Sequence, residues 1–190
     1  LLNAGKLAME GEPEAVMDYY NAMLADHQNQ TVTQEVTADG RVQTISGTGE
    51  AFVADISLLD TNGQRVEVVD VGQQVTLRIL VKTSCYIERL VLGYGIKDRL
   101  GQVIYGTNTD FKKKALLNVP AANEIFFDIS FPANFGPGTY SVQTALVSTD
   151  THLVDNYEWR DLALVFNVIN ISKTHFAGVA WVDPVIEINQ

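Results

Sequence analysis

The chain has 190 residues, of which 46% are hydrophobic and 19% charged, and its formal net charge is −10. This length and composition are sufficient for one good core, with room for an appendage. A surface this acidic argues against nucleic acid or an anionic membrane as the main partner. The apolar runs are too short to span a bilayer, and no secretion signal is visible at the start. Basic residues cluster once, at Lys112–Lys114, which we interpret as a solvated loop.

The first part of the chain differs in pattern from the rest. Residues 12–26 carry apolar side chains at helical spacing, and Pro13 suits the first turn of a helix. The residues before this helix have the pattern of a short hairpin or strand. Residues 31–48 are polar and contain several glycines, which favours a linker.

From residue 49 onward, short segments alternate apolar and polar residues and are separated by turn signals. This pattern predicts an all-β fold, an antiparallel β-sandwich of immunoglobulin-like or jelly-roll type. No βαβ unit is present, which argues against a doubly wound fold. The expected strands cover residues 51–59, 66–69, 75–81, 87–96, 103–107, 125–131, 140–146 and 162–168, with one or two short strands between 179 and 188.

No catalytic constellation stands out in the sequence. The three histidines, His27, His152 and His175, are not at metal-ligand spacing, and the single Cys85 cannot complete a zinc site. Cys85 also excludes an internal disulfide and is expected to pack in a strand. We therefore expect no enzyme activity from this chain, no cofactor and no metal site.

The outward faces of three predicted strands are small and half apolar. They carry Gly93 and Gly95 on the first, Gln143 and Ala145 on the second, and Ala163, Val165 and Asn167 on the third. A solvated face should be rich in Lys, Glu and Thr, and glycine in a strand often marks the close approach of another group. We expect a shallow trough covered by a ligand, a partner subunit or the chain's own termini. Ordinary scattered surface apolar residues are the alternative.

Two segments that we interpret as loops, Tyr105–Phe111 and Asn156–Asp161, mix aromatic and polar residues. Sugars are bound by aromatic rings against their C–H faces, with amide, carboxylate and guanidinium groups fixing the hydroxyls. The alternative is that Tyr157 and Trp159 cap one end of the sandwich. The residues of suitable type are Tyr105, Asn108, Asp110, Tyr157, Trp159 and Arg160.

The chain resembles the C-terminal part of the proteins of one known family. The stretch "LLNAGKLAMEGEPEAVMDYYNAML" resembles the last hairpin and helix of an ABC-transporter ATPase domain, with the pattern G-K-x-x-x-x-G-x-P-E-x-V. The segments "GYGIKDRLGQVIYGTNT", "GPGTYSVQTAL" and "YEWRDLALVFNV" resemble the C-terminal domain of Wzt-type subunits of O-antigen polysaccharide exporters. Their order and spacing together make the resemblance fairly specific.

The resemblance implies that the parent protein is the ATPase subunit of an ABC exporter, at the cytoplasmic face of the bacterial inner membrane. Walker motifs are absent from this chain, so no hydrolysis is assigned to it. The implied partners are an O-polysaccharide glycan, a second copy of the chain and the membrane-spanning subunit. The implied division is residues 1–30 as the ATPase tail, 31–48 as a linker and 49–190 as a carbohydrate-binding sandwich. Within it, 176–190 is a candidate exchanged strand.

The resemblance and the residue types together give two sets of candidates. The alternative function is a dimerisation and docking module without a glycan site, while a secreted adhesin is disfavoured. The candidate glycan contacts are Arg78, Arg89, Tyr105, Asn108, Gln143, Tyr157, Trp159, Arg160 and Asn167. The candidate dimer contacts are Phe176, Val179, Trp181, Val185 and Ile188.

Overall fold

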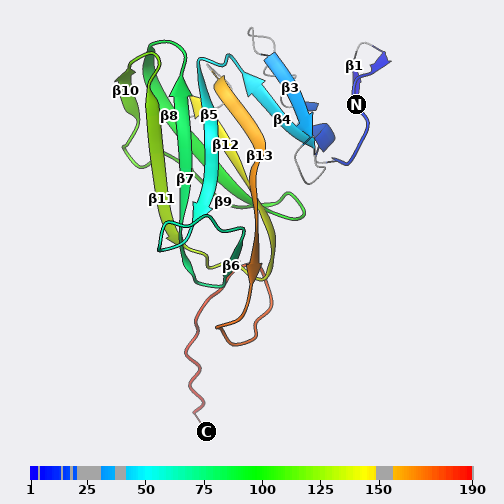
Figure 1. Cartoon of the computed structure of the whole chain (residues 1–190). Coiled ribbons are helices and arrows are strands. Elements are labelled where there is room, and N and C mark those ends of the chain that lie inside the picture. The colour runs from blue at the N-terminus through cyan, green and yellow to red at the C-terminus, as the bar shows by residue number, and fades with distance from the viewer. Residues whose placement is uncertain are drawn as a thin grey trace.

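Two β-sheets packed face to face make up most of the chain (Figure 1). The computed structural model describes residues 1–3, 5–13, 15–17, 19–20, 31–36, 42–148 and 156–189. The fold is an all-β, immunoglobulin-like antiparallel sandwich, as the sequence predicted. One pairing departs from this pattern, because β6 runs parallel to β13.

The larger sheet has the strand order β10-β8-β12-β13-β4-β3, with β9 also paired to β8 and β6 also paired to β13. Long hydrogen-bonded registers between β8 and β12 and between β12 and β13 form its centre. Its strands are β3 (Thr31–Val36), β4 (Val42–Gly47), β6 (Val68–Asp70), β8 (Ile87–Asp98), β9 (Val103–Asn108), β10 (Leu116–Val119), β12 (Gly138–Val147) and β13 (Asn156–Ile169).

The smaller sheet consists of β5 (Ala51–Leu59), β7 (Gln74–Thr83) and β11 (Glu124–Pro132), in the order β11-β7-β5. Strict alternation places Leu77 and Ile79 of β7 in the core, while Arg78 between them points outward. The core lies between the two sheets. The larger sheet contributes Leu92, Leu146 and Phe166 to it.

The N-terminal residues lie to one side of the sandwich, beyond β3 (Figure 1). A short hairpin, β1 (Leu2–Asn3) with β2 (Lys6–Leu7), is followed by a helix within residues 13–20. The remainder of the helix expected over 12–26 falls outside the described residues. Within those residues, no helix has both the length and the apolar character needed to cross a bilayer.

Residues 31–48, which the sequence predicted as a linker, contribute β3 and β4 to the larger sheet instead. Polar side chains of β4 are buried inside the fold, which a composition-based prediction cannot anticipate. The buried Gln43 side chain donates from Nε2 to the carbonyl oxygens of Asp161 and Leu162, at 2.9 and 2.8 Å. Residues 37–41 lie outside the described part of the chain.

The segment Asn156–Asp161 is not a loop, because it forms the first half of β13. Three of its polar residues, Asn156, Glu158 and Asp161, are buried. Glu158, for example, accepts a hydrogen bond from the backbone N–H of Val53 on the smaller sheet, at 3.0 Å. Alternation of apolar and polar residues, the signal that reveals other strands, is therefore weak in this segment.

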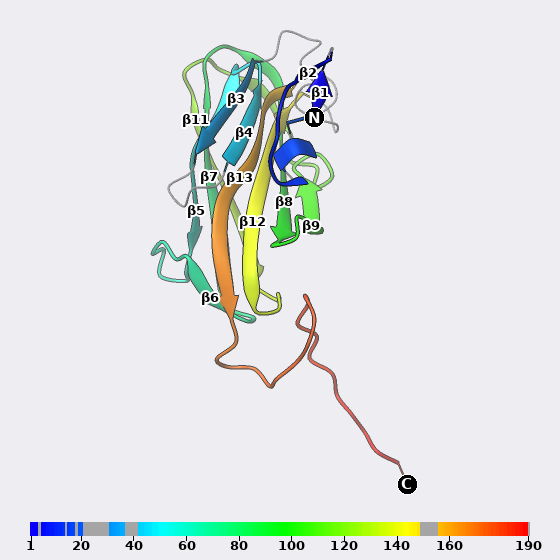
Figure 2. The ribbon, with the colours of Figure 1, turned by 90° about the vertical axis from the view of Figure 1, so that its right-hand side faces the viewer.

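The chain end forms no further strand, although one or two were expected between 179 and 188. A single bridge joins Ala180 to Phe135, and the Trp181 N–H donates to the carbonyl of Asn134 at 2.9 Å. Beyond this point the chain extends away from the sandwich, at the end opposite the N-terminus (Figures 1 and 2). Pro184 lacks an N–H group and cannot donate to a ladder there.

Candidate functional site

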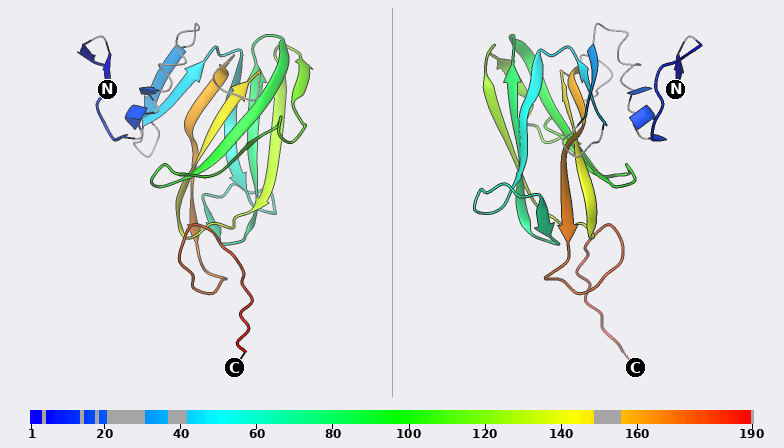
Figure 3. Two further views of the ribbon diagram at one scale, coloured as in Figure 1. Left: turned by 180° about the vertical axis from the view of Figure 1, so that it is seen from behind. Right: turned by 45° about the vertical axis from the view of Figure 1, so that its right-hand side comes forward.

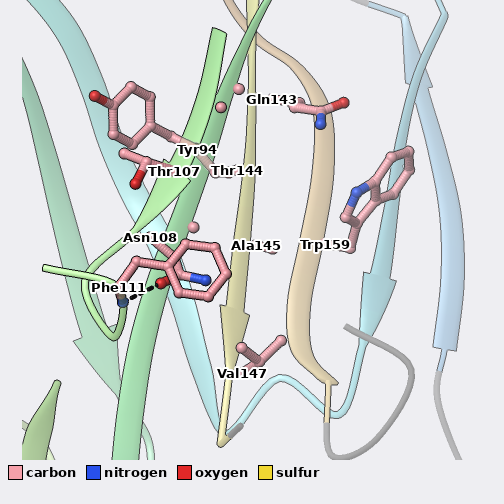
Figure 4. A pocket seen from close by; sticks show the side chains of 12 residues that line it. Tyr94, Thr107, Asn108, Phe111, Gln143, Thr144, Ala145, Val147 and Trp159 are labelled. Carbon is pink, nitrogen blue, oxygen red and sulfur yellow. Dashed lines mark hydrogen bonds between the residues drawn. The ribbon is translucent and has the colours of Figure 1, made fainter. Parts of the chain in front are cut away.

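A shallow trough crosses the outer face of the larger sheet, over β9, β8, β12 and β13 (Figure 4). Its cavity volume is about 230 Å³. The right-hand view of Figure 3 shows the smaller sheet on the opposite side of the sandwich. The trough is lined by Gly93, Tyr94, Gly95, Gly106, Thr107, Asn108, Phe111, Gln143, Thr144, Ala145, Val147 and Trp159.

The register of the strands brings together the residues that form the floor of the trough. Asn108 is opposite Gly93, Gly93 is opposite Ala145, and Ala145 is opposite Trp159, so these four residues form one row across four strands. Adjacent strands lie about 4.8 Å apart, so the row spans roughly 14 Å. The small side chains in its centre make the floor low between two larger residues.

Aromatic rings stand at both sides of this floor. Trp159 projects from β13, and Phe111 projects from the turn after β9 (Figure 4). The turn is fixed by two hydrogen bonds, from the Phe111 N–H to Asn108 Oδ1 at 2.7 Å and from the Lys114 N–H to the Thr109 carbonyl at 2.7 Å. The Phe111 ring is 67% exposed and has little packing of its own.

The polar side chains that line the trough are uncharged. They are the amides of Asn108 and Gln143 and the hydroxyls of Thr107 and Tyr94, whereas the hydroxyl of Thr144 is buried. Burial, together with the neighbouring Tyr105, raises the pKa of the Tyr94 phenol to about 12. This phenol therefore stays neutral at physiological pH and points away from Trp159 (Figure 4). The trough can accordingly exchange hydrogen bonds with hydroxyl and amide groups without a net charge.

The two cations of β8, the strand that carries Gly93 and Gly95 of the trough floor, are paired with protein groups. Lys97 and Asp161 form an ion pair at 3.0 Å, with side chains only 8% and 5% exposed. Arg89 donates to Asp110 Oδ1 at 2.5 Å and to the Ser148 carbonyl at 2.6 Å. Both cations are held by protein partners, which leaves the trough itself an uncharged surface.

Comparison with known proteins assigns this sandwich to a family. The family model described as "Wzt C-terminal domain" matches residues 42–182. The chain belongs to this family. Among solved structures, the crystal structure of the C-terminal domain of wzt is similar, with a TM-score of 0.67 and 19% identity over 77% of this chain and 89% of that one.

Two further solved structures match this chain with TM-scores below 0.5. The Pseudomonas fluorescens alkylpurine DNA glycosylase AlkC is 14% identical over 64% of this chain and 31% of its own, with a TM-score of 0.43. A CARDB domain from Pyrococcus furiosus is 11% identical over 62% of this chain and 90% of its own, with a TM-score of 0.35. Among curated proteins, none matches the chain.

In this Wzt C-terminal domain, three of the nine candidate glycan contacts line the trough. They are Asn108 on β9, Gln143 on β12 and Trp159 on β13. Tyr105 does not line it, because its ring lies beside Tyr94 with the ring centroids 6.1 Å apart.

The candidate arginines are all engaged with other groups in the family domain. Arg89 is held as described above, and Arg160 pairs with Glu158 at 3.0 Å. Arg78 lies on the outer face of the smaller sheet, far from the trough in the fold, and binds both oxygens of Asp128 at 2.7 Å. This guanidinium lowers the pKa of the Asp128 carboxyl.

The last two candidates have structural contacts. Tyr157 is only 9% exposed, and its hydroxyl donates to the Arg89 carbonyl at 3.2 Å. This agrees with the alternative that Tyr157 caps the sandwich. Asn167 accepts a hydrogen bond from Thr139 Oγ1 at 2.8 Å and is exposed near the far end of β13.

Sequence reasoning missed several trough residues. Gly106, Thr107 and Phe111 lie in the segment chosen for its composition. Strand pairing places Gly106 opposite Gly95 and Thr107 opposite Tyr94, and the turn after β9 brings Phe111 to the trough. The Asn108 side chain that accepts from the Phe111 N–H is a turn signal that could have located Phe111.

The candidate dimer contacts of this family domain divide into two groups. Phe176 and Trp181 pack together, with ring centroids 4.9 Å apart, and the Gly136 N–H donates to the Val179 carbonyl at 3.1 Å. Val185 and Ile188 are 89% and 81% exposed, on the extended chain end.

Proposed function

We propose that this Wzt C-terminal domain is a glycan-binding module that recognises O-polysaccharide in the cytoplasm and controls its export by an ABC transporter. The observation that carries the proposal is the trough, in which a floor of glycine and alanine lies between Trp159 and Phe111. Membership in the Wzt family supports the link to an exporter.

The geometry of the trough suits a sugar. Pyranose rings place apolar C–H faces against aromatic rings, while their hydroxyl groups exchange hydrogen bonds with amides and hydroxyls. Both kinds of group are present, since Asn108 and Gln143 line the same trough as Trp159. A shallow site of this kind is expected to bind with millimolar to micromolar affinity, about −4 to −8 kcal/mol.

The remaining parts of the proposal follow from the family. The domain would act at the cytoplasmic face of the inner membrane, attached to an ATPase and in contact with the membrane-spanning subunit. Its role would be binding and not catalysis, and it would select the polymer that the exporter accepts.

The test is saturation-transfer NMR between the chain and the O-polysaccharide of the bacterium that encodes it. Trp159→Ala removes one aromatic side of the trough and should weaken binding about tenfold or more without unfolding the sandwich. Trp181→Ala is the matched control, because Trp181 packs on Phe176 outside the trough. Absence of transfer to every sugar proton, with the protein folded, would refute the proposal.

A second candidate function is a dimerisation and docking module. The observation that favours it is the extended chain end, where the exposed Val182, Val185, Ile186 and Ile188 have no place in the sandwich core. Apolar residues exposed in one continuous segment often mark a protein interface. This function and glycan binding are compatible in one domain.

A further inference from the structure

A second cavity, larger than the trough, opens between the two sheets at one edge of the sandwich. It lies between β8, β9 and β10 of the larger sheet and β11 of the smaller, and its volume is about 500 Å³. Of these strands, β8, β10 and β11 lie at the left of Figure 1. We name it the open-edge groove and define it by its apolar wall, Leu92, Leu116, Ile125, Phe127 and Ile129, and by Lys112 and Lys114.

The groove exists because this edge of the sandwich is not closed. Among the described residues, β11 pairs with β7 alone, so its other edge carries unpaired backbone groups, and β10 pairs with β8 over only a few residues. Ile125, Phe127 and Ile129 point inward from β11, yet each remains partly exposed. Apolar surface that the core does not cover is therefore available to a ligand.

Two lysines line this apolar groove. Lys112 and Lys114 are exposed, and in the described part of the chain neither forms an ion pair. They belong to the single basic cluster of a chain whose net charge is −10. The turn is held by the hydrogen bond from the Lys113 N–H to the Asp110 carbonyl at 2.8 Å. Lys113 itself does not line the groove.

We propose that the open-edge groove binds a single-chain anionic lipid, with its hydrocarbon chain against Leu116, Ile125 and Phe127 and its head group at Lys112 and Lys114. The cavity volume lies within the range of small-molecule sites, which are mostly apolar with a few polar groups that fix orientation. Lysine is a point charge suited to a phosphate, and its aliphatic stem can extend the apolar wall. The carboxylate of Asp128 also lines the groove but is held by Arg78, so among the described residues the charges left for a head group are the two lysines.

This site is separate from the proposed glycan trough, although Tyr94, Thr107 and Asn108 line both cavities. The trough has an uncharged lining and aromatic sides, whereas the groove combines a mainly apolar wall with two unpaired lysines. The two sites therefore recognise different chemistry, and the lipid proposal does not depend on glycan binding.

The experiment is an NMR titration of the whole chain with dodecyl phosphate below its critical micelle concentration. Amide shifts are expected at Leu116, Ile125 and Phe127, with none at Gly95 and Ala145 in the trough. Dodecyltrimethylammonium and a nonionic dodecyl tetraethylene glycol ether, which share the same tail, should bind at least tenfold more weakly. Equal affinity for the three amphiphiles, or shifts confined to the trough, would overturn the proposal.

Variants of the basic cluster test the head-group contact. Lys112→Ala and Lys114→Ala should each weaken dodecyl phosphate binding about fivefold or more, because each removes one cation. The matched control is Lys113→Asn, which removes a neighbouring cation, and asparagine tolerates the positive φ of 57° at this position. Equal losses in all three variants would indicate unspecific attraction and would also contradict the proposal.

A peptide is the rival occupant, in particular the chain end of a second copy. A variant that ends at residue 181 decides between them. If dodecyl phosphate reaches the groove equally well in the full chain and in this variant, the lipid assignment stands. If the groove amides respond only after the chain end is removed, the groove belongs to an interface between copies and the assignment fails.

Discussion

Gly47 and Gly93 lack a side chain for two different physical reasons. A Cβ on Gly47 would lie 2.3 Å from the Tyr157 carbonyl oxygen, so the close approach of β4 to β13 excludes a side chain. A Cβ on Gly93 would instead lie 3.7 Å from the Cβ atoms of Ala145 and Asn108, which is ordinary contact. The fold thus tolerates a methyl group at Gly93. Because glycine has no side chain there, the trough is deeper at this point.

Gly93→Ala should therefore weaken glycan binding while the free energy of unfolding changes by less than about 1 kcal/mol. The added methyl raises the floor between Asn108 and Ala145, so the sugar loses contact with Trp159. Isothermal titration with the O-polysaccharide and urea denaturation measure the two effects. Gly138→Ala is the matched control, since Gly138 is a strand glycine outside the trough. Unchanged affinity in Gly93→Ala would show that the floor is not a contact surface.

Among the elements, β13 combines a bulge with buried charge. Val142 is opposite Leu164 and Thr144 is opposite Arg160, so β13 has three residues where β12 has one. Leu162 within this bulge has a φ of 45°, a strained value for leucine. The surrounding contacts hold it, through the Gln43 hydrogen bonds and the Lys97–Asp161 ion pair described above.

Removing one member of this ion pair should cost stability, because it leaves the other charge buried. Lys97→Met or Asp161→Asn alone is expected to lower the free energy of unfolding by about 3 to 5 kcal/mol. The double variant should lose less than the sum of the two. Urea denaturation of all four proteins measures the coupling. Single losses below about 1 kcal/mol, or strictly additive losses, would show that the pair does not hold the bulge.

At the scale of the whole molecule, the chain end separates into an anchored and a free part. The anchored part ends at Trp181, whose backbone pairs with Asn134 and whose ring packs on Phe176. The free part carries the exposed Val185 and Ile188. The family model ends between the two parts, at residue 182.

A variant that ends at residue 181 should remain folded and keep its glycan affinity but lose self-association. The lost segment contributes exposed apolar side chains and no core residue, so the monomer has little reason to unfold. Analytical ultracentrifugation measures the association. Replacing Val185, Ile186 and Ile188 by serine in the full-length chain tests whether apolar contact is responsible. A dimer that persists in both variants would place the interface elsewhere.

The sequence by itself determined the class of fold and the face that holds the trough. Alternation with a period of two decides which side of a strand each residue occupies, whatever strand pairs with it. This is why Gly93, Gly95, Gln143 and Ala145 could be assigned together to one outward surface before any pairing was known. The same local rule located most strands, including β5, β7 and β11.

Tertiary structure alone decided which polar residues are available to bind. Arg78 is committed to Asp128 by the register of β7 with β11, and Glu158 is buried against β5. Both partners are distant in sequence, so no local pattern reveals them. For the same reason, polar β4 and the first half of β13 could not be recognised as strands. Burial of a polar group requires a partner, and only the assembled sheets supply it.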